Sequence, residues 1–582
     1  MKKALIIPLL FVAFTLSAAP IGERKAREIA TTFFANSSTR ATSPVLSLEW
    51  AGEKISGMNI APLSASNSDE AVLYIYNRED AKGFVVVAGD DNVEKQIVAF
   101  SHDNTMRVNN LSDGAKYILS AWCKQIAAAR VGAKIATRAD ASDVGTVQKL
   151  YSTALWNQGA PFNNEAPIID GMRAVTGCVA TAMSIICYHN KYPEYGVGTT
   201  PSYSYTSYGA SYQVPSNTLG RRYDYSRMRS DNYESGYSFM EGAAVAALMK
   251  DMGTAVQMMY HYNASGAYDM NVPLALSTYF GYTKAAQLTY ADSYSEREWA
   301  KLLKENVATY GPTYFSGQSG EGGHAFVIDG YTNENYFHIN YGWGGVDNGY
   351  FLIPRVEYAY DQVALFGLEP DKSGTSTYKD NLLLMRYNEQ EGLVSGTEKY
   401  ETGKSFNMKA GAIWNTGNVT FSGKVQIALC NKDGDIKETL YTATLNNLGV
   451  YYLTWIETSV TIWSQIAAGD RIRVMYKGQY SDGWQWARRY EQGVTDEILV
   501  SATEADIARS LSFKYDKQNK RIVLNSTYQL TYKVLDSFNR AKASGSISLS
   551  GGATISVSDW SAGEYRISVS KDSSVYNLTI VL

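Results

Sequence analysis

The spacing of apolar residues predicts a small α+β unit at the start of the chain. Residues 23–35 place their apolar side chains on one helical face. Residues 71–76 and 83–88 are apolar runs separated by a short polar stretch, which is typical of a β-hairpin. Ser112 is a suitable N-cap for a helix that runs to about Arg130.

A second unit is predicted over residues 150–370. It follows residues 131–149, which are polar, rich in small residues and without periodicity, as expected of an exposed linker. Within the unit, apolar spacing predicts a helix near Cys178 and a strand near His324. The stretch 195–225 is rich in Tyr, Ser and Gly, and we expect it to be a long loop insertion.

The remainder of the chain has the character of all-β domains. Residues 424–430 and 436–442 flank an Asp-Gly turn, a strong hairpin signal. Residues 380–500 fit a sandwich of the immunoglobulin type, and residues 505–582 a second small β unit. The fold class expected for the whole chain is therefore α+β.

The first nineteen residues predict an export signal. Lys2 and Lys3 give a positive start, an apolar run reaches Leu16, and small residues follow at 17–19. The run is too short to span a bilayer comfortably, and no other run reaches the length a membrane helix needs. We expect a secreted or cell-surface protein with no membrane span.

Composition narrows the function classes. The length of 582 residues suggests about four units. Hydrophobic residues make up 45% and charged residues 19%, which fits folded domains. The chain has 53 Lys and Arg residues and 57 Asp and Glu residues, so it has no excess of positive charge with which to bind nucleic acid. Four cysteines are too few for a disulfide scaffold, and only five histidines are available for imidazole chemistry.

Cys178 is the thiol with the best position for chemistry. Gly177 allows a tight turn, and the following residues favour a helix, so Cys178 falls at a helix N-terminus. The positive end of a helix dipole favours the nucleophilic thiolate. An inert buried thiol fits the local pattern equally well.

The other thiols are expected to be structural. Cys123, Cys187 and Cys430 each fall within a predicted helix or strand, so no disulfide is predicted. Cys178, Cys187 and His189 offer only three metal ligands with no clear fourth. We therefore predict no metal and no cofactor.

A thiol nucleophile needs a base, and His324 is the best candidate. It lies 146 positions after Cys178, which is inside the range of about 130–150 that papain-like enzymes use between nucleophile and base. A glycine-rich loop precedes it, and Gly323 is a candidate for contact with a substrate backbone. His338, inside an apolar strand, is expected to be structural.

Two further segments are candidates for supporting roles. Gln158 precedes Cys178 by 20 residues, and its amide can donate to an oxyanion beside the N–H of Cys178. Asn340, Tyr341 and Trp343 follow His324 and are candidates for orienting the imidazole, as a third triad member does. A simple glycine-aromatic turn between strands explains the same residues.

These motifs together resemble the streptopain family of papain-fold cysteine peptidases, which includes interpain-like secreted bacterial proteases. The resemblance rests on Gln158, the segment 177–181, the segment 322–330 and the segment 340–345. It implies that Cys178 is the nucleophile, His324 the general base and Gln158 an oxyanion donor. This chain departs from the family at Tyr341, where members typically have Trp.

The resemblance also implies a domain order and a zymogen. We expect an inhibitory prodomain at 20–145, a papain-like peptidase domain at 146–370, and β domains at 380–500 and 505–582. The last domain weakly resembles a sorting domain for an outer-membrane secretion machinery. The implied partners are protein or peptide substrates and the chain's own prodomain, which acts as an intramolecular inhibitor. A hydrophobic residue is the family preference at the second position before the scissile bond.

Two alternative functions stay open from the sequence. In the first, the peptidase unit is inactive and the protein binds to surfaces through its tyrosine-rich loop and β domains. In the second, the thioester of Cys178 reacts with an amine rather than with water, as in a transamidase. Retention of Cys178, His324 and Gln158 favours a peptidase over the first alternative.

Overall fold

The computed structural model describes a defined set of residues. They are 20–36, 43–52, 71–91, 93–130, 142–319, 322–354, 362–388, 390–516, 519–526, 528–548, 552–571 and 574–582. The predicted signal peptide at 1–19 and residues 131–141 of the predicted linker lie outside this set.

The chain forms two compact units. The first comprises the residues up to Asn110 together with Leu119–Val144, and the second comprises Leu111–Ile118 together with Gly145–Leu582. Helix α2 (Asp113–Arg130) therefore begins in the second unit and continues in the first.

The first unit is an antiparallel sheet with a helix against it. Helix α1 packs on the second and third strands and buries the face predicted from its sequence. The predicted hairpin is confirmed, since Leu73 pairs with Ala88. The strands in sheet order are β1 (Leu46–Gly52), β2 (Leu73–Arg78), β3 (Phe84–Ala88) and β4 (Ile97–Ser101), with α1 at Glu23–Asn36 and a 3-10 turn, η2, at Val108–Asn110.

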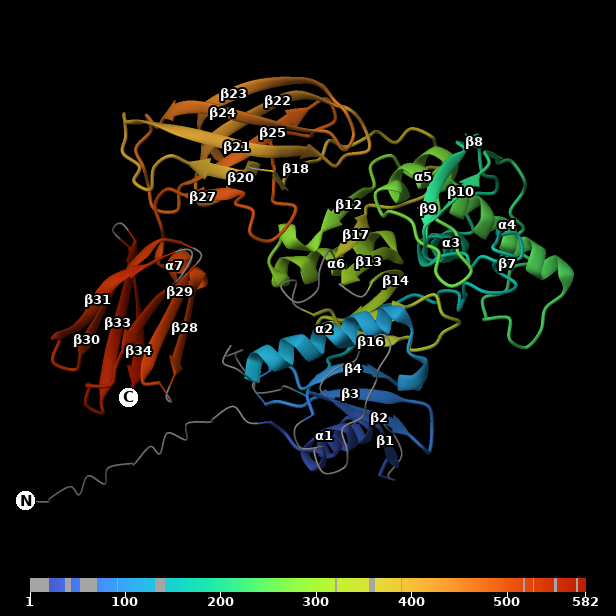
Figure 1. Cartoon of the computed structure of the whole chain (residues 1–582), viewed down its shortest axis with the longest axis horizontal. Helices are drawn as coiled ribbons and strands as arrows, with labels where there is room; N and C mark the ends of the chain where they lie inside the picture. The colour runs from blue at the N-terminus through green and yellow to red at the C-terminus, as the bar shows by residue number, and fades with distance from the viewer. Residues whose placement is uncertain are drawn as a thin grey trace, which may run out of the picture. The chain divides into compact units, whose positions relative to one another are not determined.

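The second unit begins with an antiparallel sheet flanked by helices (Figure 1). Helix α3 packs on β14, α4 packs on α3, and α6 packs on β13 and β14. The sheet order is β16 (Gly349–Leu352), β15 (Tyr336–Asn340), β14 (Gly322–Thr332), β13 (Thr313–Ser319), β17 (Val363–Phe366) and β12 (Gln287–Tyr290). The helices are α3 (Cys178–Asn190), α4 (Phe239–Ala255), α5 (Asn271–Tyr279), α6 (Glu296–Tyr310) and the 3-10 turn η3 (Ala291–Ser293).

Part of the predicted linker is a strand. β5 (Val147–Leu150) pairs with β14, with Leu150 opposite Gly330, so the expectation of a loop up to residue 149 is wrong at its end. Its residues are mostly exposed and show no apolar alternation. The strand is therefore held by backbone pairing with a neighbour that is distant in sequence, which local pattern does not reveal.

The predicted loop insertion is also more ordered than expected. Within residues 195–225, Tyr205 and Tyr223 are buried, and their hydroxyl groups donate to the carbonyl of Tyr260 and to Asp251. Tyrosine combines a large apolar ring with a polar tip, so a tyrosine-rich segment can pack on a core while it resembles a polar loop. Two short antiparallel strand pairs lie within this segment: β8 (Thr199–Thr200) with β11 (Asn217–Thr218), and β9 (Tyr203–Ser207) with β10 (Ala210–Val214). A third pair precedes it, β6 (Ile168–Ile169) with β7 (Met172–Arg173).

Residues 382–499 form two five-stranded antiparallel sheets around one apolar core. The predicted hairpin within it is confirmed, with the end of β22 at Cys430 paired to Ile436. One sheet contains β18 (Leu382–Leu384), β19 (Arg386–Tyr387), β20 (Gln390–Ser395), β21 (Ser405–Asn415) and β24 (Leu453–Thr461). The other contains β22 (Phe421–Cys430), β23 (Ile436–Leu448), β25 (Arg471–Gly478), β26 (Gln485–Trp486) and β27 (Glu497–Leu499).

The C-terminal residues form a second all-β arrangement with its own core, drawn in red in Figure 1. Its elements are α7 (Glu504–Ser510), β28 (Leu511–Asp516), β29 (Arg521–Ser526), β30 (Leu530–Asp536), β31 (Ala541–Ile547), β32 (Ala553–Ser556), β33 (Glu564–Lys571) and β34 (Ser574–Val581). Across the described part of the chain, no helix combines the length and apolarity needed to cross a bilayer.

Candidate active site

Helix α3 begins at Cys178, as the sequence predicts. Gly177 precedes it with φ of 84°, a conformation that residues with a side chain rarely adopt. A Cβ at Gly177 would lie 2.6 Å from the sulfur of Met258 and 3.0 Å from the carbonyl oxygen of Ser265. Glycine is therefore needed for the close approach that leads into the helix. Cys178 lies at the positive end of the helix dipole, which favours a thiolate.

His324 lies on the neighbouring sheet, close enough to Cys178 for each of the two side chains to shift the pKa of the other. It stands near the start of β14, and its side chain is only 5% exposed. Its Nε2 lies 3.0 Å from the carbonyl oxygen of Tyr341, which fixes the orientation of the ring. The two residues, 146 positions apart in sequence, therefore form a thiol–imidazole pair held by two different elements.

The electrostatics of the pair favour its charged form. Burial alone raises the pKa of the Cys178 thiol, but attraction to His324, their hydrogen bond and the backbone N–H of Ala325 outweigh burial and lower it. Burial lowers the pKa of His324, but the interaction with Cys178 and the carbonyl of Tyr341 outweigh it and raise this pKa. The site therefore favours a thiolate beside an imidazolium, which is the activated form of a cysteine nucleophile.

We expect alkylation of Cys178 by iodoacetamide to persist at acidic pH in the processed protein. A thiol with a lowered pKa keeps its thiolate until the pH falls through that lowered value. Between pH 8 and pH 6, an ordinary thiol with a pKa of about 8.5 should slow about 100-fold, and Cys178 by less than about tenfold. Peptide mapping of the modified sites measures the rate at each pH. Cys187, whose pKa burial raises to about 12, is the internal control and should stay unmodified. A 100-fold slowing at Cys178 would contradict the ion pair.

Gln158 lies next to the segment that leads into Cys178. Its carbonyl oxygen accepts a hydrogen bond of 3.1 Å from the N–H of Thr176, two residues before the thiol. Its own N–H donates to the side chain of Asn157 at 2.7 Å. The backbone of Gln158 is thereby held beside the segment that leads into α3, where a donor to an oxyanion would be needed. Its role as an oxyanion donor stays a prediction.

Among the three candidates for orienting His324, the main chain of Tyr341 makes the direct contact. The ring of Trp343 lies edge-on to the imidazole, with 6.5 Å between the ring centroids. Asn340 instead donates to the hydroxyl of Thr153 and to the carbonyl of Ala154. It also accepts from the N–H of Gly342 at 3.1 Å, so it fixes the loop that presents the Tyr341 carbonyl.

The remaining predicted residues are placed around this pair. Gly323 is exposed and pairs with Gln318 at the start of β14, beside His324. Cys123, Cys187 and Cys430 are buried, and none of the three forms a disulfide. His338 contacts the carboxylate of Asp329 within the sheet. Among the residues that the structure describes, no group of three or more His, Cys, Asp or Glu is arranged to hold a metal ion.

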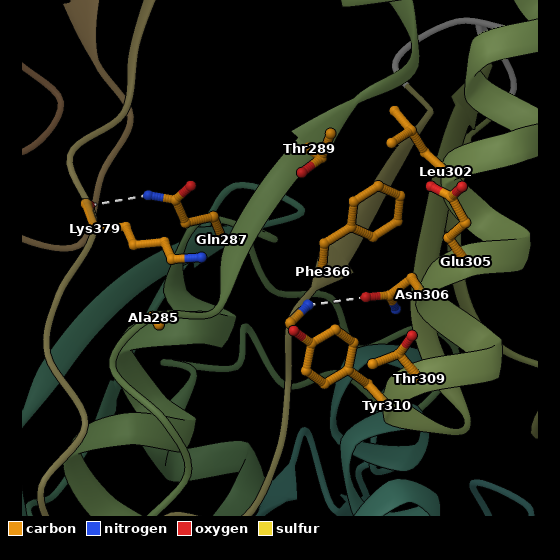
Figure 2. A pocket seen from close by; sticks show the side chains of 11 residues that line it. Ala285, Gln287, Thr289, Leu302, Glu305, Asn306, Thr309, Tyr310, Phe366 and Lys379 are labelled. Carbon is orange, nitrogen blue, oxygen red and sulfur yellow. Dashed lines mark hydrogen bonds between the residues drawn. The ribbon is translucent and has the colours of Figure 1, made fainter. Parts of the chain in front are cut away.

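A separate cavity of about 300 Å³ lies between α6 and the edge of the sheet (Figure 2). Figure 2 shows Phe366 and Tyr310 among the residues that line it. Gln287 donates to the carbonyl of Lys379, and the N–H of Gly367 donates to Asn306. Its lining contains no thiol and no imidazole. This cavity therefore lacks the groups for the chemistry assigned to Cys178.

A cysteine at the start of a helix, paired with a histidine on an adjacent antiparallel sheet, defines a papain-like cysteine peptidase. Comparison with known families agrees: residues 156–351 match the Peptidase C10 family, and residues 18–126 match the Spi protease inhibitor family. The chain is 30% identical to streptopain of Streptococcus pyogenes over 316 residues, which are 50% of this chain and 75% of streptopain. The chain belongs to the streptopain-like Peptidase C10 family of cysteine peptidases.

The chain is also similar to a second curated protein and to a solved structure. The chain is 28% identical to the thiol protease/hemagglutinin PrtT of Porphyromonas gingivalis over 538 residues, which are 85% of this chain. It spans 58% of the length of PrtT. It is also similar to the structure of prointerpain A of Prevotella intermedia, with 27% identity and a TM-score of 0.43. That similarity covers 53% of this chain and 96% of the prointerpain chain.

Proposed function

We propose that this protein is a secreted cysteine endopeptidase that is made as a zymogen and hydrolyses extracellular proteins. In this mechanism the Cys178 thiolate attacks the carbonyl carbon of a peptide bond, and the oxyanion is held by Gln158 and the N–H of Cys178. His324 protonates the leaving amine and then removes a proton from water, which hydrolyses the thioester and regenerates the thiol.

The observation that carries the proposal is the pairing of Cys178 with His324, each of which shifts the pKa of the other. The pKa of Cys178 is lowered while that of His324 is raised, although burial acts against both shifts. A pair retained only for packing gains nothing from this arrangement, because desolvation penalises both charges. The pair therefore favours a working enzyme over an inactive homologue that binds to surfaces.

Contacts of the segment Leu111–Ile118 support the zymogen part of the proposal. Gly114, in the first turn of α2, lies so close to the pair that a Cβ on it would be 2.3 Å from the ring of Tyr341. The same Cβ would be 2.8 Å from Cδ2 of His324. Because this segment packs so closely against His324, it leaves no room beside the imidazole for a substrate or for the leaving amine.

Two more contacts hold this segment against the site. The ring of Tyr117 lies on Gly317, where a Cβ would be 2.6 Å from it, and Gly317 pairs with His324. The N–H of Ser112 donates to the carboxylate of Asp347 at 2.6 Å. Activation in this proposal requires the segment to leave, which removal of residues 20–145 would achieve.

The location and the C-terminal domains belong to the same proposal. Residues 1–19 would direct export and be removed. Residues 505–582 would serve as a sorting domain for outer-membrane secretion machinery, with residues 380–500 as an accessory sandwich. The substrates would be extracellular proteins, with the hydrophobic preference of the family at the second position before the cut bond.

The direct test is incubation of the processed protein with an unstructured protein and a soluble primary amine. A form that begins at Gly145 keeps β5 in the peptidase sheet and serves as the second enzyme sample. We expect fragments with new amino termini, and none from the Cys178→Ala variant. Products that carry the amine would identify a transamidase instead. If neither the processed protein nor the form that begins at Gly145 cleaves the substrate, the result supports the inactive, surface-binding alternative and rejects the proposal.

A further inference from the structure

Asp329 is a buried carboxylate on the strand that carries His324, and the mechanism above gives it no role. It follows His324 in β14 and is 1% exposed. The register of β14 against β15 shifts between Ile328 and Gly330, so Asp329 is the extra residue of a bulge. Bulges redirect a side chain and are common beside active sites. The side chain of Asp329 is therefore aimed by the bulge and not by regular alternation along the strand.

Both carboxylate oxygens of Asp329 have a partner. Oδ1 contacts Nδ1 of His338, and Oδ2 accepts a hydrogen bond from the hydroxyl of Thr153. The main-chain carbonyl of Asp329 also accepts from the N–H of Tyr151 at 2.8 Å. Thr153 belongs to the segment that connects β5 to Gln158. Asp329 thus ties this segment to the strand of the base.

The carboxylate sets the direction of the Thr153 hydroxyl. Because a carboxylate offers only acceptors, the hydroxyl proton must point to Asp329. The same oxygen then presents its lone pairs to Asn340, whose Nδ2 donates to it at 2.9 Å. Nδ2 also donates to the carbonyl of Ala154 at 2.8 Å, which leaves Oδ1 of Asn340 to accept from the N–H of Gly342. Asp329 therefore fixes which way the Asn340 amide faces.

The loop held by Asn340 carries the carbonyl oxygen that orients His324. That oxygen belongs to Tyr341, the next residue, and lies 3.0 Å from Nε2 of the imidazole. The loop has a second tie, because the N–H of Gly344 donates to the carbonyl of Trp156 at 2.9 Å. One network therefore holds the base and the segment that precedes the proposed oxyanion donor.

We propose that Asp329 is a positioning residue for the peptidase reaction. It fixes the direction of the Thr153 hydroxyl, and through this hydroxyl the amide of Asn340. The amide in turn holds the carbonyl that keeps the imidazole of His324 in place for proton transfer. This inference rests on the proposed function, in which His324 is the base. Because Asp329 acts through other residues, its loss should slow the reaction and leave substrate binding unchanged.

The test compares Thr153→Val with Thr153→Ser in the processed protein on one fluorogenic peptide. Valine keeps the shape of threonine but can neither donate to Asp329 nor accept from Asn340, whereas serine keeps the hydroxyl. We expect Thr153→Val to lower kcat about tenfold or more and to change KM by less than about twofold, since a misplaced base slows chemistry without weakening binding. Thr153→Ser should restore most of the activity.

The pH profile separates positioning from a general loss of packing. Burial lowers the pKa of His324, while Cys178 and the carbonyl of Tyr341 raise it. Cys178 is unchanged in these variants, so a loosened carbonyl should lower this pKa. The imidazolium is then lost at lower pH, and the alkaline limb of kcat/KM should move to lower pH in Thr153→Val.

A double variant tests whether Asp329 acts through Thr153. Asp329→Asn alone should also lower kcat, because an amide can donate to the hydroxyl and reverse its direction. Asp329→Asn combined with Thr153→Val should lose little more than Thr153→Val alone, since residues that act in series are not additive. If Asp329→Asn does not fold, the comparison of the two Thr153 variants decides.

A matched control is Thr289→Val. Thr289 is half-buried on β12, at the edge of the same sheet, and this variant should keep the kcat and the pH profile of the unaltered protein. The inference is overturned if Thr153→Val keeps either of them, if Thr153→Ser loses as much as Thr153→Val, or if the losses multiply in the double variant. The proposed function stands in each of these cases. It fails instead if the unaltered processed protein cleaves no peptide and no unfolded protein.

Discussion

Replacing Cys178 with alanine is expected to lower kcat/KM by at least about 10⁴-fold, because the variant has no nucleophile to form the thioester. His324→Ala should cause a loss of similar size, since the thiolate depends on the imidazolium beside it. The double variant should lose little more than either single one, because residues that act as a unit are not additive. Steady-state kinetics on one fluorogenic peptide measure all three.

The control for this prediction is the second thiol of the same helix. Cys187→Ala removes a fully buried thiol whose pKa is raised by burial, so its sulfur is protonated and inert. We expect this variant to keep most of its activity after a modest loss of stability. If Cys178→Ala keeps more than about 1% of the activity of the unaltered protein, the result contradicts the assignment of Cys178 as the nucleophile.

The same variant also reports on maturation. If the enzyme removes its own prodomain, Cys178→Ala should accumulate in the full-length form. Normal processing of the variant would assign that cut to another protease and leave the peptidase mechanism in place.

Gly114→Leu is expected to activate the full-length chain before its prodomain is removed. The added side chain would have to displace the rings of Tyr341 and His324 or leave the site, because a Cβ alone already overlaps Tyr341. Overpacking of this kind costs about 1–3 kcal/mol, which converts to roughly five- to 150-fold in the fraction of open enzyme. The initial rate of peptide cleavage by full-length protein, before any processing appears on a gel, measures the change.

Two comparisons keep this prediction specific. Ala127→Leu introduces the same leucine side chain at an exposed position of α2 and should leave latency unchanged. The form that begins at Gly145 lacks position 114 and sets the rate of the fully open enzyme. A Gly114→Leu protein that is as latent as the unaltered chain would show that this segment does not block the site.

The pairing of Cys178 with His324 could be predicted from the sequence because its signals are carried by residue types. A glycine before a cysteine indicates a tight turn of the backbone at the start of a helix. Gly177 has the backbone conformation that such a turn requires. His324 was identifiable because only five histidines occur and one follows a glycine-rich stretch.

The group that orients His324 could not be predicted in the same way. It is the carbonyl oxygen of Tyr341, and every residue type offers a carbonyl. The sequence motif pointed to the correct loop, but the side chain of Asn340 bonds within that loop and not to the imidazole.

Prediction of the fold failed mainly where pairing is non-local. The tyrosine-rich segment 195–225 lacks a clear period, yet Tyr205 is held by a hydrogen bond to a residue 55 positions away. Burial of rings with polar tips hides the apolar pattern on which sequence interpretation depends.

If the chain matures as proposed, strand β5 would set a limit to how far its amino terminus can be trimmed. Its residues Lys149 and Leu150 pair with Tyr331 and Gly330, and these belong to β14, the strand that carries His324. An exopeptidase or a second self-cleavage that trims past Val147 would leave that edge of the catalytic strand without its partner. In the proposed zymogen, the amino terminus of the processed chain would then be held by backbone pairing with β14, the strand that carries His324.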